Sequence, residues 1–327
     1  MDETTALLEI IRRSSRVLKP LPTGLKRRGV LSRRVKAVLF DLYGTLFISA
    51  SGGLDAAGLS VEDEEPDKAQ RRGESAPRVG ENRRAGLRDA SLAASLSELL
   101  KTYGISGDPL SVLLRFRERI LGEHERMRKE GVDFPEVRIE EVWKDVLEMG
   151  RVERARRFAV EFECLVNPVW PMPYARALIE ELHEAGVLLG IVSNAQFFTP
   201  LLFRAFFDAA EVELGFHEEL ILYSYVHGRA KPSLVLFERA RDVLRRRSIL
   251  PENVLFVGND EANDLLPAFR TGFQTALFGG DRRSLRTGNT ESGACRRFPD
   301  LLVTSLEELS ALLKQGPAGQ DSSQRTS

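Results

Sequence analysis

Residues 36–46 have the sequence KAVLFDLYGTL, in which a short apolar run ends at Asp41 and is followed by Gly44 and Thr45. The Val, Leu and Phe content of the run is typical of a strand that is buried on both faces of a sheet. An acid in this place matters chemically, because ligands of open parallel sheets bind at the carboxyl ends of the strands. We therefore predict that Asp41 lies at a ligand-binding edge of a sheet.

The second half of the chain alternates predicted helices with predicted strands. Apolar patterns indicate strands at residues 187–193, 220–223, 253–257, 273–277 and 301–303, and helices at residues 174–185, 232–247, 264–271 and 306–313. This alternation is typical of a mainly parallel sheet with helices on both faces. The predicted fold class is therefore α/β, with a core formed by residues 35–48 and 171–315.

Between these two parts, residues 91–170 have helical periodicity, and nothing in residues 91–165 alternates like a strand. The clearest helix is expected to have Asp108 as its cap and Pro109 as its first residue, and to end before Gly131. Trp143 is expected to pack in an apolar core. We predict a separate all-helical lobe that is inserted into the α/β core.

Three other segments differ in composition from the core. Residues 1–34 combine a short predicted helix with a basic stretch, and we interpret them as a solvated N-terminal extension. Residues 49–90 contain few large apolar side chains, so they cannot bury enough surface to offset the entropy of ordering, and a flexible insertion is predicted. Residues 316–327 are polar and are predicted to form a disordered tail.

Size, charge and cysteine content exclude several classes of protein. The chain has 327 residues, which exceeds the roughly 250 to 300 residues at which a single core stops growing, so two lobes are expected. Its 47 basic and 48 acidic side chains give no overall charge that would attract nucleic acid. Two cysteines form no disulfide framework, no apolar run could span a bilayer, and the first residues do not resemble a signal peptide. We predict a cytoplasmic protein with no membrane or nucleic-acid partner; the oligomeric state is not predicted.

Polar side chains also follow other predicted strands of the core. Ser193 and Asn194 end one strand, Lys231 precedes a predicted helix, and an acidic loop with Asn259, Asp260 and Asp264 follows another strand. Because the carboxyl ends of parallel strands share one edge of the sheet, these groups are expected to meet Asp41 there. A carboxylate, a hydroxyl, an ammonium and an acidic cluster around one point predict a reaction centre.

This order of motifs resembles the haloacid dehalogenase (HAD) superfamily of hydrolases, and the resemblance covers residues 35–313. It implies a Rossmann-like sheet, a helical cap domain at residues 91–170 and a nucleophilic carboxylate at Asp41. It also implies a magnesium ion and a small phosphorylated substrate. The candidate catalytic residues are then Asp41, Tyr43 and Lys231; the candidate substrate-binding residues are Thr45, Ser193, Asn194 and Lys231; and the candidate Mg²⁺ ligands are Asp41, the Tyr43 backbone carbonyl, Asn259, Asp260 and Asp264.

Lys231 has a clear electrostatic role in this scheme. A carboxylate that attacks a phosphoryl group is repelled by it, so the site needs a cation. Lys231 can neutralise both Asp41 and an incoming anion, and the N-terminal dipole of a helix that begins at Pro232 would add to this charge.

One position departs from the phosphatases of this superfamily, which carry a second Asp where this chain has Tyr43. A phenol has an ordinary pKa near 10 and is a poor proton donor and base near neutrality. Leaving groups that need no proton, such as those of acyl phosphates and phosphoanhydrides or a halide, would be affected least.

Two alternatives to a phosphatase stay open at this point. A 2-haloacid dehalogenase would use Asp41 without a metal and hold the halide with an arginine such as Arg115, Arg117 or Arg119. The acidic loop argues against it, since a metal-free enzyme has no need of that charge. A catalytically silent module that binds a phosphorylated ligand or a protein is the other alternative.

Overall fold

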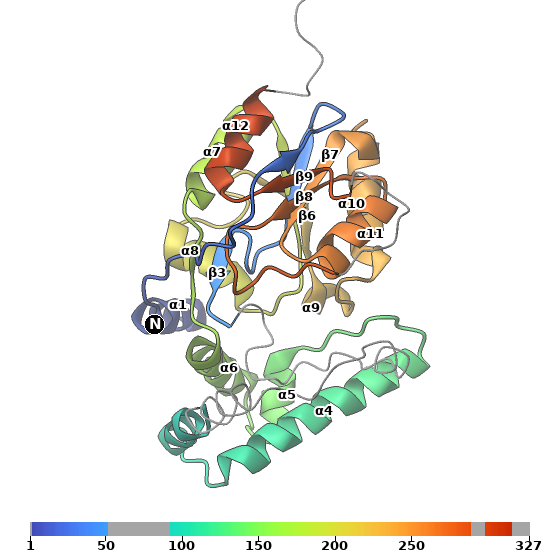
Figure 1. The fold of residues 1–327 in the computed structure, drawn as a ribbon. Helices are drawn as coiled ribbons and strands as arrows, with labels where there is room; N and C mark the ends of the chain where they lie inside the picture. Colours follow the sequence, from blue (N-terminus) through green and yellow to red (C-terminus); the bar gives the residue numbers. More distant parts are fainter. Residues whose placement is uncertain (1, 52–91, 289–297, 316–327) are drawn as a thin grey trace, which may run out of the picture.

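A computed structural model of the chain describes residues 2–51, 92–288 and 298–315. Its centre is a seven-stranded sheet (Figure 1). In spatial order the strands are β1 (Arg28–Gly29), β9 (Leu301–Val303), β8 (Gln274–Phe278), β7 (Val254–Gly258), β2 (Ala37–Phe40), β5 (Leu188–Ser193) and β6 (Phe216–Tyr223). All neighbouring pairs are parallel except β1 with β9. The predicted α/β class and parallel sheet are confirmed.

Strand β2 lies inside the sheet, between β7 and β5, and its side chains are apolar on both faces. Val38 and Phe40 pack in one core cluster, while Ala37 and Leu39 pack in the other. Helices cover both faces (Figure 1): α7 (Ala175–Glu184), α8 (Thr199–Phe207) and α12 (Leu306–Gln315) on one side, and α10 (Leu234–Arg246) and α11 (Leu266–Arg270) on the other. Shorter turns are α9 (Ser224–His227), η1 (Pro251–Asn253) and η2 (Glu261–Leu265).

The helical lobe lies below the sheet in Figure 1 and has a core of its own. It contains a helical segment at residues 92–102 and the helices α4 (Pro109–Lys129), α5 (Ile139–Val146) and α6 (Val152–Val166). Asp108 caps α4 by accepting a hydrogen bond from the Ser111 backbone nitrogen at 2.9 Å, as the sequence predicts. Trp143 is fully buried and stacks on Phe116, also as expected.

The sequence analysis missed a small antiparallel pair between the core and the helical lobe. Strand β3 (Phe47–Ser49) pairs with β4 (Val169–Pro171), and the structure therefore does not continue as helix up to residue 170. Each strand has three residues, which is too short for an alternating pattern to be recognised.

The N-terminal segment is not simply a solvated extension, because helix α1 (Glu3–Ser14) and strand β1 pack on the rest of the protein. Helix α1 buries Leu7, Ile10 and Ile11 against α6 and α8, and β1 adds an edge strand to the sheet. The three buried side chains share one face of the helix because they are spaced by three and four residues. The sequence predicts this helix but not its packing partners.

The predicted tail at 316–327, and the predicted insertion at 49–90 apart from its first residues, lie outside the described residues. Within the described part of the chain, none of the helices combines the length and apolar content that crossing a membrane requires. The cytoplasmic location stays a prediction.

Candidate active site

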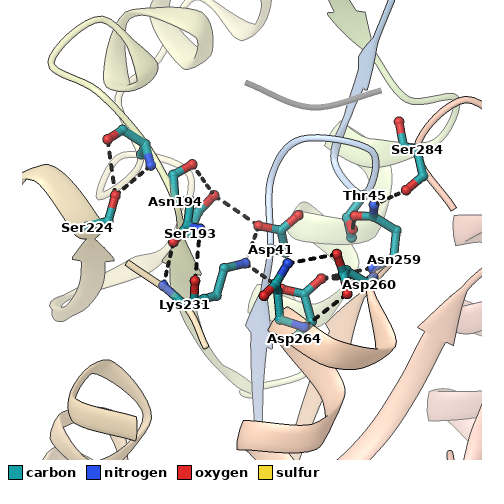
Figure 2. Close-up of polar contacts among 12 residues, drawn as sticks. Asp41, Thr45, Ser193, Asn194, Ser224, Lys231, Asn259, Asp260, Asp264 and Ser284 are labelled. Atoms are coloured by element: carbon teal, nitrogen blue, oxygen red, sulfur yellow. Dashed lines mark hydrogen bonds and ion pairs between the residues drawn. The ribbon is translucent and has the colours of Figure 1, made fainter. Parts of the chain in front are cut away.

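Asp41 follows the central strand β2 and lies at the carboxyl edge of the sheet (Figure 2). Its backbone nitrogen donates to the Val257 carbonyl at 2.9 Å, which fixes the start of the loop against β7. Its carboxylate oxygen Oδ1 accepts hydrogen bonds from Ser193 Oγ at 3.0 Å and from Lys231 Nζ at 2.6 Å. The structure thus brings the predicted carboxylate, hydroxyl and ammonium together.

Lys231 is buried between two carboxylates, because Nζ also donates to Asp264 Oδ1. Burial lowers the pKa of Lys231, but the negative charges of Asp264 and Asp41 outweigh it, so the pKa lies above its ordinary value. Burial raises the pKa of Asp264, and the Lys231 charge opposes that rise. A protonated Lys231 next to Asp41 is the arrangement that an anionic substrate requires.

Asn194 holds the lysine in place through its backbone. The Lys231 nitrogen donates to Asn194 Oδ1 at 2.7 Å, and Asn194 Nδ2 donates to the Lys231 carbonyl at 3.3 Å. Helix α10 begins at Leu234 and is capped by Ser233, so Lys231 lies outside the helix. The expected help from a helix dipole at Pro232 is therefore smaller, and Asn194 is a positioning residue rather than a substrate ligand.

The two acids of the acidic loop do not present free oxygens. Asp264 Oδ2 accepts from the backbone nitrogens of Asn259 and Asp260, both at 3.1 Å, and its Oδ1 accepts from Lys231. Asp260 caps η2: its Oδ1 accepts from the backbone nitrogens of Ala262 and Asn263, and its Oδ2 from Asn263 Nδ2. Both carboxylates are thus engaged inside the loop and with Lys231, and direct binding of a metal by Asp260 and Asp264 stays a prediction.

Asn259 and Thr45 connect the acidic loop with the loop after β2. Thr45 Oγ1 donates to Asn259 Oδ1 at 3.1 Å, and Asn259 Nδ2 donates to the Ser284 carbonyl at 2.6 Å. Thr45 is fully buried, so its hydroxyl supports the loop instead of meeting a substrate. Ser284 was not predicted, because no strand or motif marks its position.

The Tyr43 side chain does not act at this centre. Its hydroxyl is 2.9 Å from Thr199 Oγ1, and burial raises the pKa of the phenol far above its ordinary value. The ring lines a small apolar cavity against α1, α6 and α8, together with Ile11, Glu163, Cys164 and Phe206. The side chain is thus no candidate acid or base, and only the Tyr43 backbone carbonyl stays a candidate ligand.

The other candidate ligands of a hard cation such as Mg²⁺ are the Asp41 carboxylate, the Tyr43 backbone carbonyl and Asn259 Oδ1, which also accepts a hydrogen bond from Thr45. Carboxylate, carbonyl and amide oxygens are all ligands that Mg²⁺ accepts, with water completing the shell. Only one of the three carries a formal charge. Across the described ranges, no cluster of three or more His, Cys, Asp or Glu side chains could hold a metal ion. The donor set fits a weakly held ion.

A statistical model of the haloacid dehalogenase-like hydrolases matches residues 35–272. The chain belongs to this family. Over 142 residues this HAD-like hydrolase is 29% identical to a ribulose-1,5-bisphosphate 5-phosphatase from Halopiger xanaduensis. That match covers 43% of this chain and 56% of the relative, so the chain spans little more than half the length of that protein.

This HAD-like hydrolase is also similar to two solved structures. A HAD phosphatase from Thermococcus onnurineus is 17% identical with a TM-score of 0.46, over 85% of this chain and 98% of that chain. A 2-haloacid dehalogenase from Pseudomonas syringae pv. Tomato is 19% identical with a TM-score of 0.43, over 86% of this chain and 99% of that chain. The family assignment rests on the family model.

The arginines that we considered for a halide site lie on the exposed face of α4. Arg115, Arg117 and Arg119 are all exposed, and Arg119 pairs with Asp145 at 3.0 Å and with Glu123 at 3.2 Å. No contact of these side chains with the reaction centre is found among the residues that the structure describes. They do not supply the halide site that a dehalogenase would need.

The helical lobe of the HAD-like hydrolase touches the core beside the reaction centre, through residues that the sequence analysis missed. Gln196, two residues after Asn194, donates to the Glu136 carboxylate and to the Val137 carbonyl, both at 3.1 Å. Ser224 Oγ donates to Glu136 Oε2 at 2.7 Å. Glu136 therefore joins the helical lobe to two segments of the core.

Replacing Glu136 with Gln is expected to remove a pH dependence of stability. Burial raises the pKa of Glu136 from about 4.5 to about 7. The folded protein therefore holds this proton more tightly than the unfolded chain, so the stabilisation is complete below about pH 4.5 and is lost as the pH rises through 7. Between pH 5 and pH 8 the wild type should lose about 2 kcal/mol of unfolding free energy relative to E136Q, measured by urea titration. Parallel pH profiles would contradict this.

Proposed function

We propose that this HAD-like hydrolase is a Mg²⁺-dependent phosphatase that acts on a small phosphorylated metabolite through an aspartyl-phosphate intermediate. One observation carries the proposal. The Asp41 carboxylate lies at the end of the central strand with one oxygen held by Lys231 and Ser193. Its other oxygen has no hydrogen bond within the described part of the protein. A carboxylate that is oriented by hydrogen bonds to one oxygen, and that has no bidentate partner on both oxygens, suits nucleophilic attack.

In the first step the Asp41 carboxylate forms a bond to phosphorus while the bond from phosphorus to the leaving oxygen breaks. In the second step water attacks the same phosphorus, inorganic phosphate leaves and the carboxylate is restored. Lys231 offsets the repulsion between the two anions, and the Ser193 hydroxyl holds Asp41 in its orientation. Asp41, the Tyr43 carbonyl and Asn259 would hold Mg²⁺, which when bound supplies positive charge for a phosphoryl oxygen.

The arrangement favours leaving groups that depart without a proton. The position at which phosphatases of the superfamily carry an acid is occupied by Tyr43, and its hydroxyl is engaged with Thr199. Acyl phosphates, phosphoanhydrides and aryl phosphates should therefore react faster than simple alkyl phosphates. The name of the Halopiger relative supports a phosphorylated substrate in general terms only.

The test is a panel of acyl, aryl and alkyl phosphates and 2-haloacids, each assayed with Mg²⁺ and with a chelator. Phosphate release that the chelator abolishes supports the proposal. Halide release that the chelator does not affect would identify a dehalogenase instead. A dehalogenase is the second candidate because the metal position has only one charged ligand, and such an enzyme works without a metal. Phosphate binding without any turnover would identify a silent binding module.

Replacing Tyr43 with Phe should leave turnover nearly unchanged. The phenol is buried and cannot deliver a proton to a leaving group, so kcat for an aryl phosphate should stay within about threefold of wild type. Loss of the hydrogen bond to Thr199 should cost about 1 kcal/mol of unfolding free energy. Steady-state kinetics and urea titration measure both effects. A drop in kcat of about 100-fold would show that the phenol takes part in the reaction.

A further inference from the structure

The loop after β8, residues 281–288, runs along the acidic loop and has no role in the mechanism so far. The Arg286 backbone nitrogen donates a hydrogen bond to the Asn259 carbonyl, and the Glu261 backbone nitrogen donates one to the Arg286 carbonyl, both at 2.9 Å. The Gly288 nitrogen donates to Glu261 Oε2 at 2.9 Å. The two loops are therefore joined as neighbouring strands would be, with a bridge between Asp260 and Arg286.

The chemistry of its partners fixes the orientation of the Asn259 side chain. The Ser284 backbone carbonyl, 2.6 Å from Nδ2, can only accept a hydrogen bond, so the amide nitrogen must face it. The amide oxygen then faces Thr45, whose hydroxyl donates to it at 3.1 Å (Figure 2). A carboxylate at position 259 has no proton to offer Ser284.

Gly44 shows how closely the three segments pack. A Cβ atom at this position would lie 2.4 Å from Ser284 Cβ and 2.9 Å from Asn259 Cγ, and Gly44 has a φ of +88°. Asp281, which is fully buried, holds the loop by accepting from the backbone nitrogens of Leu21 and Arg283. The loop after β8 is thus wedged against the loop that carries Asp41.

We propose that residues 281–288 are a positioning element of the active site. In this element the Ser284 carbonyl requires an amide at position 259, and Asn259 in turn holds the Asp41 loop through Thr45. Asn259 therefore has a structural reason to be uncharged, although an Asp there would add a charged ligand for the metal. The inference rests on the proposed function only in taking Asp41 as the nucleophile.

The first test is the isosteric variant Asn259→Asp, studied by thermal unfolding in the presence of a chelator. A buried carboxylate oxygen would face the Ser284 carbonyl with no proton between them, so Tm should fall by about 8 °C. The matched control is Asn253→Asp: Asn253 Nδ2 also donates to a backbone carbonyl, that of Arg34 at 2.8 Å, but in an exposed position. Its Tm should fall by no more than about 2 °C. Equal, small losses in both variants would overturn the proposal.

The second test separates positioning from general stabilisation and also serves if Asn259→Asp does not fold. In Asn259→Ala, hydrogen exchange of a peptide covering residues 41–47 should accelerate about tenfold relative to wild type and to Asn253→Ala. In the same variant kcat, measured at saturating Mg²⁺, should fall about 30-fold with KM within about threefold, since Lys231 and Ser193 are unchanged. Unchanged exchange at residues 41–47 would overturn the proposal, whatever the Tm. Neither the Tm nor the exchange measurement depends on finding the substrate, so failure of the proposed function would be recognised separately.

Discussion

Replacing Asp41 with Asn is expected to reduce kcat by about four orders of magnitude or more, because an amide oxygen cannot form the acyl phosphate. The side chain keeps its shape, so the hydrogen bond from Ser193 to the oxygen at this position can persist. The variant should still fold and bind phosphate. The measurement is single-turnover hydrolysis of an aryl phosphate, together with mass spectrometry of the acid-quenched wild type, in which a phosphoryl group should be found on the peptide that contains Asp41.

The comparison with Asp260→Asn makes this result specific. Asp260 caps η2 through Oδ1, and Asn is an equally good cap, so this variant should keep kcat within about fivefold of wild type. A loss as large as that of Asp41→Asn would show that Asp260 binds the metal after all. Turnover by Asp41→Asn at a tenth of the wild-type rate would remove Asp41 from the mechanism.

The reaction centre could be predicted from local patterns because the parallel sheet brings residues at the ends of separate strands together. An apolar run that ends in an acid identifies the end of a strand, and parallel strands bring their carboxyl ends to one edge. Asp41, Ser193 and Lys231 meet for this reason, although 190 positions separate the first from the last. The predicted strands also lie near the observed ones, apart from β6, which begins at Phe216 rather than Leu220.

The finer roles could not be predicted, because they depend on which backbone atoms lie near each side chain. Asp260 and Asp264 are the same residue type in one loop, yet one caps a turn and the other binds Lys231. Ser284 acts through its carbonyl, which every residue type possesses. The apolar stripe of α1 predicts a helix but not its partners α6 and α8. Such information is in the tertiary contacts and not in the local pattern.

Replacing Lys231 with Met should combine the loss of activity with a large loss of stability. The ammonium separates Asp41 from Asp264, and without it two buried carboxylates would face each other. Removing one partner from a buried ion pair costs about 3–5 kcal/mol, which urea titration at pH 7.5 should show. kcat/KM should fall by about three orders of magnitude, because nothing then offsets the repulsion between Asp41 and the substrate.

The direction of the pH effect distinguishes this explanation from a simple packing defect. In Lys231→Met the pKa of Asp264, which burial already raises, should rise further in the folded state because the Lys231 charge no longer lowers it, so the variant regains stability as the pH falls and loses it as the pH rises. A packing defect would give a loss that is independent of pH.

The double variant Lys231→Met with Asp264→Asn completes the argument. It also removes the Asp264 charge, so that Asp41 is the one charged group left of the three. With no second carboxylate to repel Asp41, most of the stability should return at pH 7.5. Activity should not return, because the cation opposite the nucleophile is still absent. Recovery of both stability and activity would mean that Lys231 only keeps two acids apart; recovery of stability alone assigns it the electrostatic role in catalysis as well.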